Sequence, residues 1–240
     1  MSNLSLQEAF ESGRLRAQWT TYLLMGDAFF ALASITVHLF QIKRFSGFKA
    51  TERLAEIGVN DLDTLDTLEG LISLAGMIIF LATAVLFMMW IYRASRNLSL
   101  LGVSDQHYSP RLATCSFIIP FANLFIPHRV VKELWSKSAT NSENSILQEK
   151  KPATPAFIGW WWGSWVFSNL VTPITFHPGL RAETVNQRLT IVSLNLISEV
   201  SLLLATVLAI RVIKAINNRQ TESSQRIPNF GQPPPPPIFE

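Results

Sequence analysis

Four long apolar runs constrain the fold of this chain most strongly. They lie at about residues 19–42, 71–92, 156–176 and 189–213. An α-helix rises about 1.5 Å per residue, so about 20 apolar residues cross the hydrocarbon core of a bilayer. The first run is longer than a signal-peptide core and is therefore expected to be a retained anchor. The sequence predicts an all-α integral membrane protein, a helical bundle with four spanning helices.

Composition and charge agree with this prediction. Hydrophobic residues make up 48% of the 240 residues and charged residues 15%, with a mean hydropathy of +0.25. The charged residues lie mostly between the apolar runs, where a multi-pass protein carries its charge. The single cysteine, Cys115, excludes an intramolecular disulfide and is expected to be a small buried side chain.

A fifth apolar segment, residues 111–127, is broken by proline. Pro120 and Pro127 each remove a backbone hydrogen bond and are expected to kink or end a helix. Asn123 lies between them and is expected to pair with the backbone groups that the prolines free. The segment is either re-entrant or a kinked helix that crosses. Residues 128–138, with apolar side chains on one helical face, are predicted to form an interfacial helix in the headgroup layer.

The Lys and Arg residues bear on the number of crossings. If the broken segment is re-entrant, four spans leave the N-terminus (1–18), residues 93–155 and the tail (216–240) in the cytoplasm. Together with Arg211 and Lys214, which close the last span, that side then holds 14 of the 20 Lys and Arg. If it crosses, five spans divide them 7 to 13. Cytoplasmic loops are enriched in Lys and Arg, and the distribution slightly favours four spans. The polar linker 43–70, which carries an acidic run, is then outside and is expected to be solvated.

Polar residues within the apolar runs form a candidate intramembrane polar site. Its members are Asp27, His38, Asn169, Asn195 and Glu199. Inserting a carboxylate at the bilayer centre costs about 2.5–3.5 kcal/mol on insertion scales, so each such residue is expected to have a structural or functional role. It either hydrogen-bonds a neighbouring helix or belongs to a proton or cation relay. In the first run, a polar stripe with a seven-residue period is expected to face protein: Thr20, Asp27, Ser34 and Gln41.

Three motifs in the middle of the chain carry a resemblance. A basic patch with Asn follows the second run, a Pro-x-x-Asn-Leu-x-x-Pro core comes next, and a Glu-Leu-Trp sequence follows it. Their residues are Arg93, Arg96 and Asn97, then Pro120, Asn123 and Pro127, then Glu133 and Trp135. Together they resemble the bacterial membrane proteins of the domain-of-unknown-function 4328 family (DUF4328). This resemblance implies a bacterial membrane location and this layout of helices, but no activity.

Signatures of enzymes are absent from the sequence. It contains no His-Glu-x-x-His, Gly-x-Ser-x-Gly, P-loop or cysteine pair, so we expect no enzyme, no cofactor and no metal site. No nucleic-acid partner is expected. Arg93, Arg96, Arg129 and Lys132 form a basic cluster that either sets the topology or attracts anionic headgroups. The proline-rich tail is expected to be disordered or to bind an SH3- or WW-like partner.

The sequence favours one function over a second. The first is a non-enzymatic, multi-pass component of the bacterial cytoplasmic membrane that packs with itself or with another membrane protein. The alternative is a small transporter or channel that uses Asp27 and Glu199.

Overall fold

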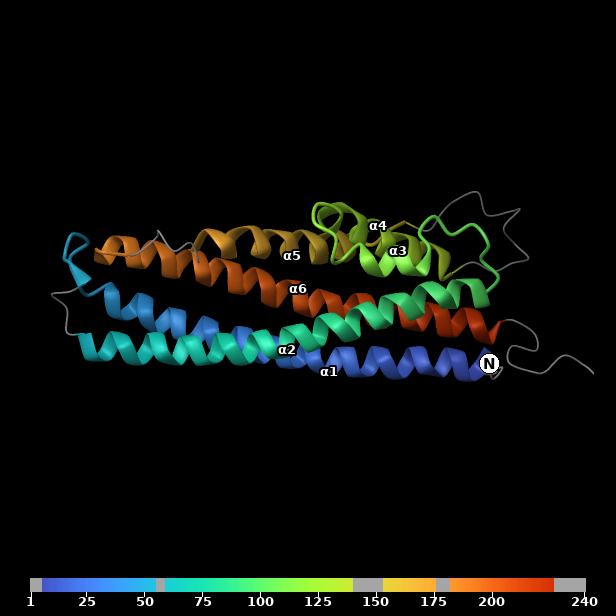
Figure 1. The fold of residues 1–240 in the computed structure, drawn as a ribbon, viewed down its shortest axis with the longest axis horizontal. Helices are drawn as coiled ribbons and strands as arrows, with labels where there is room; N and C mark the ends of the chain where they lie inside the picture. Colours follow the sequence, from blue (N-terminus) through green and yellow to red (C-terminus); the bar gives the residue numbers. More distant parts are fainter. Residues whose placement is uncertain (1–5, 55–58, 140–152, 176–181, 227–240) are drawn as a thin grey trace, which may run out of the picture. The chain divides into compact units, whose positions relative to one another are not determined.

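The chain is helical throughout the residues that the structure describes. This computed structural model describes residues 6–54, 59–139, 153–175 and 182–226. These contain six helices, shown in Figure 1: α1 (Leu6–Phe45), α2 (Val59–Leu100), α3 (Pro110–Cys115), α4 (Ala122–Lys137), α5 (Ala156–Thr175) and α6 (Val185–Gln225). Within the described residues the only β-pairing is an isolated antiparallel bridge between Arg53 and Thr184.

Among the helices of the described residues, three are long and apolar enough to cross a membrane. They are Gly13–Phe45 within α1, Thr64–Leu100 within α2, and all of α6. Helices of 40 to 42 residues are about 60 Å long, about twice the thickness of the hydrocarbon core. The prediction of a membrane protein built of helices agrees with these three elements.

The helices extend beyond the predicted apolar runs, because hydropathy finds the apolar part of a helix and not its polar ends. Residues 1–18, predicted as the N-terminal segment before the first span, are helical from Leu6. Residues 43–70, predicted as a linker, include the first turns of α2, which begins at Val59. The tail predicted to be disordered from residue 216 is helical to Gln225. The proline-rich run that follows lies outside the described residues.

The chain forms two compact units, and each is described by itself. The first unit contains residues 1–21, 84–158 and 211–240. Its interior includes Trp90, Ile91 and Leu98 of α2, with Ile213 and Ile216 of α6, all 2% exposed or less. Phe87 packs against both Trp90 and Phe117, with ring centroids 5.3 and 5.6 Å apart.

The second unit contains residues 22–83 and 159–210. Here α1 and α2 approach closely at two glycines. A Cβ added at Gly26 would lie 3.3 Å from Ile79, and one added at Gly76 would lie 3.3 Å from Phe30. At one end, Phe45 and Val185 form a small buried cluster, and the backbone of residues 50–54 bonds to that of residues 183–186.

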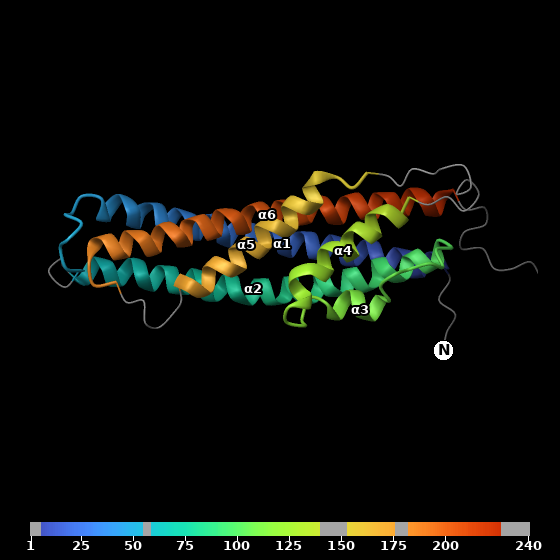
Figure 2. The ribbon, with the colours of Figure 1, turned by 90° about the horizontal axis from the view of Figure 1, so that it is seen from above.

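The proline-broken segment forms a helical hairpin in the first unit, visible in Figure 2. The Ser109 side chain accepts a hydrogen bond from Leu112 N–H and caps α3, and Pro110 occupies the first turn. Pro120 follows the end of α3, and Phe121 turns the chain with a positive φ of 62°. Because α3 and α4 contact each other, the chain reverses direction here.

Three predictions for this segment need correction. Pro127 does not end a helix, because α4 already begins at Ala122 and Pro127 lies inside it. The helix predicted over residues 128–138 therefore starts six residues earlier. Its apolar face does not meet lipid, since Val130, Val131 and Leu134 are 2% exposed or less. Cys115, expected to be buried, is exposed.

Large apolar side chains cover the outward faces of the long helices. Among those more than half exposed are Phe29, Phe40, Leu71, Ile78, Leu81, Trp160, Leu170 and Ile174. The predicted polar stripe of α1 points the other way: Thr20, Ser34 and Gln41 are 6% exposed or less, and Asp27 is half-buried. This prediction is confirmed for these four residues. Apolar outside and polar inside is the arrangement that a lipid environment favours.

The glycine contact between α1 and α2 makes a first prediction. Gly76→Val should lower the stability of the protein by about 1–3 kcal/mol, because the added side chain overlaps Phe30. Gly70→Val is the matched control, since it lies on the same helix and an added Cβ there meets nothing within 4 Å among the described residues. Thermal unfolding in detergent measures both. Equal stability of the two variants would contradict the close approach.

Candidate functional site

The five residues of the candidate intramembrane site do not converge on one point. Asp27 of α1 lies beside α2, where it hydrogen-bonds Thr83. The Thr83 hydroxyl also lies 2.9 Å from the Ile79 carbonyl oxygen of its own helix. The carboxylate of Asp27 therefore serves a contact between two helices.

His38 belongs to a different group of contacts, near the end of α1. Its Nδ1 lies 3.4 Å from Gln41 Oε1 and 3.7 Å from the Glu69 carboxylate. The Gln41 amide donates to Glu69 at 2.9 Å and to Asp66 at 3.3 Å. These bonds tie the last turns of α1 to the first turns of α2.

The same group extends to α6. The Arg188 guanidinium forms an ion pair with Asp66, and it lies 5.9 Å from the centroid of the Phe45 ring. The charge of Glu69 also acts on Glu199, the predicted carboxylate of α6. Helix α6 thus joins this group through Arg188 and Asp66. Of the predicted site, His38 lies beside Glu69, Glu199 is affected by its charge, and Asp27 is not part of the group.

Sequence analysis missed the central members of this group. Asp66 and Glu69 were expected to be solvated as part of an acidic run, yet the Glu69 side chain is only 22% exposed. The available signal was the spacing: His38 and Gln41 are three apart on one helix, and Asp66 and Glu69 are three apart on the next. Each pair therefore presents both polar groups to the neighbouring helix.

The remaining two predicted residues stand apart from this group. The Asn169 amide donates to the Trp165 carbonyl of its own helix at 2.8 Å, and Asn169 is exposed. Asn195 is half-buried on α6. The contact between α5 and α6 is made instead by small hydroxyl residues, since Ser198 lies 3.0 Å from both Ser168 and Thr172. Ser168 and Thr172, one turn apart on α5, thus form one side of this contact.

The motif residues lie in the first unit, where a buried amide network joins three helices. Asn97 of α2 donates to Gln220 Oε1 at 3.1 Å. Gln220 Nε2 in turn donates to the Ala94 carbonyl at 2.9 Å and to the Ser138 hydroxyl at 3.2 Å. Ser223 completes the network by donating to the Ser138 carbonyl at 2.6 Å. Gln220 is 1% exposed, so this single amide connects α2, α4 and α6 in the interior.

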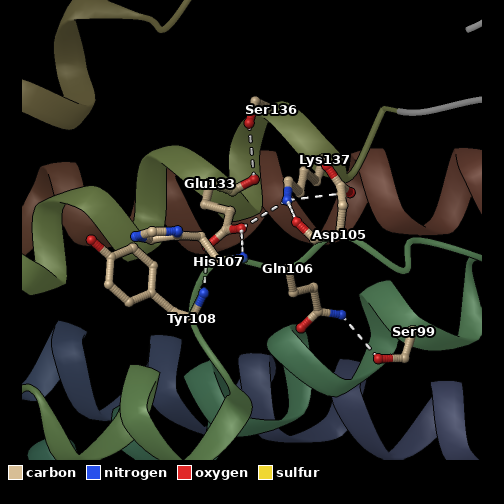
Figure 3. A network of polar contacts seen from close by, with 8 residues as sticks. All are labelled: Ser99, Asp105, Gln106, His107, Tyr108, Glu133, Ser136 and Lys137. Atoms are coloured by element: carbon tan, nitrogen blue, oxygen red, sulfur yellow. Dashed lines mark hydrogen bonds and ion pairs between the residues drawn. The ribbon is translucent and has the colours of Figure 1, made fainter.

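Glu133 joins the two ends of the α3–α4 hairpin, as Figure 3 shows. Its carboxylate accepts the backbone N–H groups of His107 at 2.6 Å and Tyr108 at 3.2 Å. It also lies 2.9 Å from Lys137 Nζ, which pairs with Asp105 at 3.3 Å. The chain that enters the hairpin at Asp105 therefore lies beside the chain that leaves it at Lys137.

Trp135 and the basic motif residues have separate environments. The Arg219 guanidinium stacks 3.4 Å from the centroid of the Trp135 ring and donates to the Trp135 carbonyl at 3.1 Å. Arg96 is exposed, whereas Arg93 is half-buried, with an atom of its side chain 3.5 Å from where a Cβ on Gly13 would lie. The predicted basic cluster is thus divided between an interior and an exposed part.

Asn123 does not take the role predicted for it. Its backbone N–H bonds to the Ile119 carbonyl at 2.9 Å, which continues the turn into α4. Its side-chain oxygen is buried and has no hydrogen-bond partner among the described residues. The backbone, not the Asn123 amide, thus carries the turn.

A shallow depression lies on the polar surface of the first unit. It has a volume of about 570 Å³ and is lined by Ser99, Gly102, Val103, Ser104, Gln106, His107, Ser109 and Pro110. Gln106 donates to Ser99 across it at 2.9 Å (Figure 3). Within the described residues, no group of three or more His, Cys, Asp or Glu side chains could hold a metal ion.

The buried amide network makes a second prediction. Gln220→Leu keeps the side-chain volume but removes bonds to Asn97 and Ser138, and should cost about 1–3 kcal/mol of stability. Asn218→Leu is the control, because Asn218 is exposed on the same helix. Unfolding in detergent micelles compares the two. If Gln220→Leu were no less stable than Asn218→Leu, the network would not hold the first unit together.

Comparison with known proteins identifies the family. No curated protein and no solved structure matches the chain significantly. Residues 53–218 match the family described as a domain of unknown function, DUF4328. This match contains all eight residues of the three motifs and the helices from α2 into α6. The chain belongs to the DUF4328 family.

Proposed function

We propose that the chain is a non-enzymatic component of the bacterial cytoplasmic membrane that crosses it four times and packs with itself or with another membrane protein. The proposed spans are α1, α2, α5 and α6. The first, second and last include the three helices long and apolar enough to cross. With 20 residues, α5 is about 30 Å long, which matches the hydrocarbon core.

The path of the hairpin supports four crossings over five. Asp105 and Lys137 form an ion pair, so the chain enters and leaves the hairpin at nearly the same place. A helix that crossed the bilayer would separate these two residues by about 30 Å. The α3–α4 hairpin is therefore proposed to dip into one leaflet and return.

Charge supports the orientation. The first unit contains both chain ends and the hairpin. Residues 1–18, 93–155 and 211–240 together hold 14 of the 20 Lys and Arg. By the positive-inside rule these segments are cytoplasmic.

The proposal of a packing role depends mainly on the contacts that the interior polar groups make. Asp27 bonds to Thr83, His38 to Gln41 and Glu69, and Ser198 to Ser168, each across or along a contact between helices. Polar side chains that hold helices together need no cargo to explain them. A relay would require Asp27 and Glu199 to communicate, whereas they take part in separate contacts.

The outward face of α5 supports a partner in the membrane. At Gly159 and Gly163 an added Cβ would meet nothing within 4 Å among the described residues. Glycines four residues apart on one helical face allow another helix to approach closely. The row that contains Ser164 and Ser168 already packs inside the protein, which leaves the glycine row for a second chain.

The four-span topology makes a third prediction, tested by cysteine accessibility. In a Cys115→Ser background, Ser99→Cys, Ala139→Cys and Ser46→Cys each place one thiol at an exposed position. Ser99→Cys and Ala139→Cys flank the hairpin and should react with an impermeant reagent from the cytoplasmic side. Ser46→Cys should react from the opposite side. Reaction of the two flanking positions from opposite sides would replace this topology with five spans.

The packing role of Asp27 makes a fourth prediction. A double-mutant cycle of Asp27→Ala and Thr83→Ala should show a coupling of about 0.5–2 kcal/mol in the stability of the detergent-solubilised protein. Thr36→Ala replaces Thr83→Ala in the control cycle. Thr36 lies on the exposed side of α1 and bonds to its own helix, so its effect should add to that of Asp27→Ala. A coupling with Thr83 no larger than the control would remove the packing explanation and favour transport.

A further inference from the structure

The outward face of α4 carries aromatic side chains at its start and basic side chains further along the helix. Successive residues of an α-helix are about 100° apart, so residues 125, 128, 129 and 132 fall on one stripe, and Phe121 directly precedes the first residue of the helix. The opposite side of α4 is buried through Pro127, Val130, Val131 and Leu134. The stripe begins with two aromatic residues, Phe121 and Phe125, and continues with His128, Arg129 and Lys132. We call this set the α4 stripe.

The aromatic end of the α4 stripe is strongly exposed. Phe121 is 82% exposed and Phe125 is 65% exposed, and the neighbouring Ile118 is 68% exposed. Phe121 also holds a positive φ of 62°, a conformation that costs a non-glycine residue about 1–3 kcal/mol. A large apolar side chain at an exposed and strained position needs an apolar environment outside the chain.

The other end of the α4 stripe is cationic. Arg129 and Lys132 are exposed, and the nearest carboxylate along the chain, Glu133, is bound to Lys137 and to two backbone N–H groups. Partial burial, followed by the charges of Lys132 and Arg129, lowers the pKa of His128 below its ordinary value. The side chains around His128 therefore form a positive site that favours an anion.

The spacing of the two ends fits the border of a leaflet. Along α4, Arg129 and Lys132 lie about 6 and 10 Å from Phe125, at 1.5 Å per residue. The headgroup layer on each side of the hydrocarbon core is about 5–8 Å thick. With Phe125 below that layer, both long basic side chains reach the phosphate groups.

We infer that the α4 stripe binds anionic lipid headgroups and thereby anchors the hairpin in the cytoplasmic leaflet. Phe121 and Phe125 enter the acyl region, and Arg129 and Lys132 hold headgroup phosphates. This inference rests on the proposed dip of the hairpin into one leaflet and adds the class of lipid that it selects. Each Lys or Arg near an anionic surface favours binding about fivefold, so two residues suffice for a clear preference.

The test measures which lipid surrounds the tip of the hairpin. The full chain, with Ile118→Cys in a Cys115→Ser background, is labelled with a fluorophore and reconstituted into mixed vesicles of phosphatidylglycerol and phosphatidylcholine. Bromine in the acyl chains of one lipid or the other quenches the label at equal total bromine. The ratio of the two quenching efficiencies reports the local enrichment of the anionic lipid.

The expected result is stronger quenching by brominated phosphatidylglycerol. Arg129→Gln/Lys132→Gln should bring the ratio to about one, because this variant removes the attraction to anionic headgroups. Arg211→Gln/Lys214→Gln is the matched control, which removes the same charge from exposed positions of α6 and should keep the preference. Binding should also raise the pKa of His128, visible in its NMR titration, on anionic vesicles but not on zwitterionic ones.

Each of the other outcomes would overturn one part of this inference. Equal quenching by the two lipids would remove the anionic site but leave the dip of the hairpin intact. Loss of the preference on addition of inorganic phosphate would assign the site to free anions instead of lipid. Quenching by neither lipid would show that the tip lies outside the membrane, which removes the proposed dip as well. The four-span topology is judged separately by cysteine accessibility.

Discussion

Helices surrounded by lipid have no hydrophobic force that drives them together, so the fold depends on hydrogen bonds and close contacts between them. Both units of this chain meet that constraint in their own way. In the first, the Gln220 amide bonds to groups on α2 and α4. In the second, Gln41 and Arg188 bind the carboxylates at the start of α2, and glycines bring α1 and α2 into contact. The hydrogen bonds of the Gln220 and Gln41 amides also offset the cost of burying these polar groups.

The hairpin shows how a proline-broken segment is stabilised by contacts away from its turn. Its turn exposes Pro120 and strains Phe121, so the turn itself contributes little stability. The stabilising contacts lie at the base, where Glu133 accepts two backbone N–H groups from the incoming chain and pairs with Lys137. Hydrogen bonds to a charged acceptor are stronger than those between neutral groups. Glu133 and Trp135 appeared in the sequence only as part of a motif. In the structure they help to fix the path of the chain at the base of the hairpin.

Residue patterns predicted the helical class, the family and the inward polar stripe of α1, because hydropathy and periodicity are local properties of a sequence. The ends of α1, α2 and α6 were not predicted, since their polar residues look like linker when tertiary contacts are unknown. Glu69 was misjudged for the same reason: its partners His38 and Gln41 lie on another helix. The apolar face of α4 was recognised, but a pattern alone cannot distinguish a face that meets lipid from one that meets protein.

The strained turn at Phe121 has a consequence for how sequences of this kind can vary. Glycine would adopt the positive φ without strain, and the folded chain in detergent would gain stability from it. The same exchange would remove the most exposed aromatic side chain of the hairpin. Stability and the proposed membrane contact therefore favour different residues at this position. Selection for a thermostable variant in micelles would favour changes here that weaken the proposed attachment of the hairpin to a bilayer.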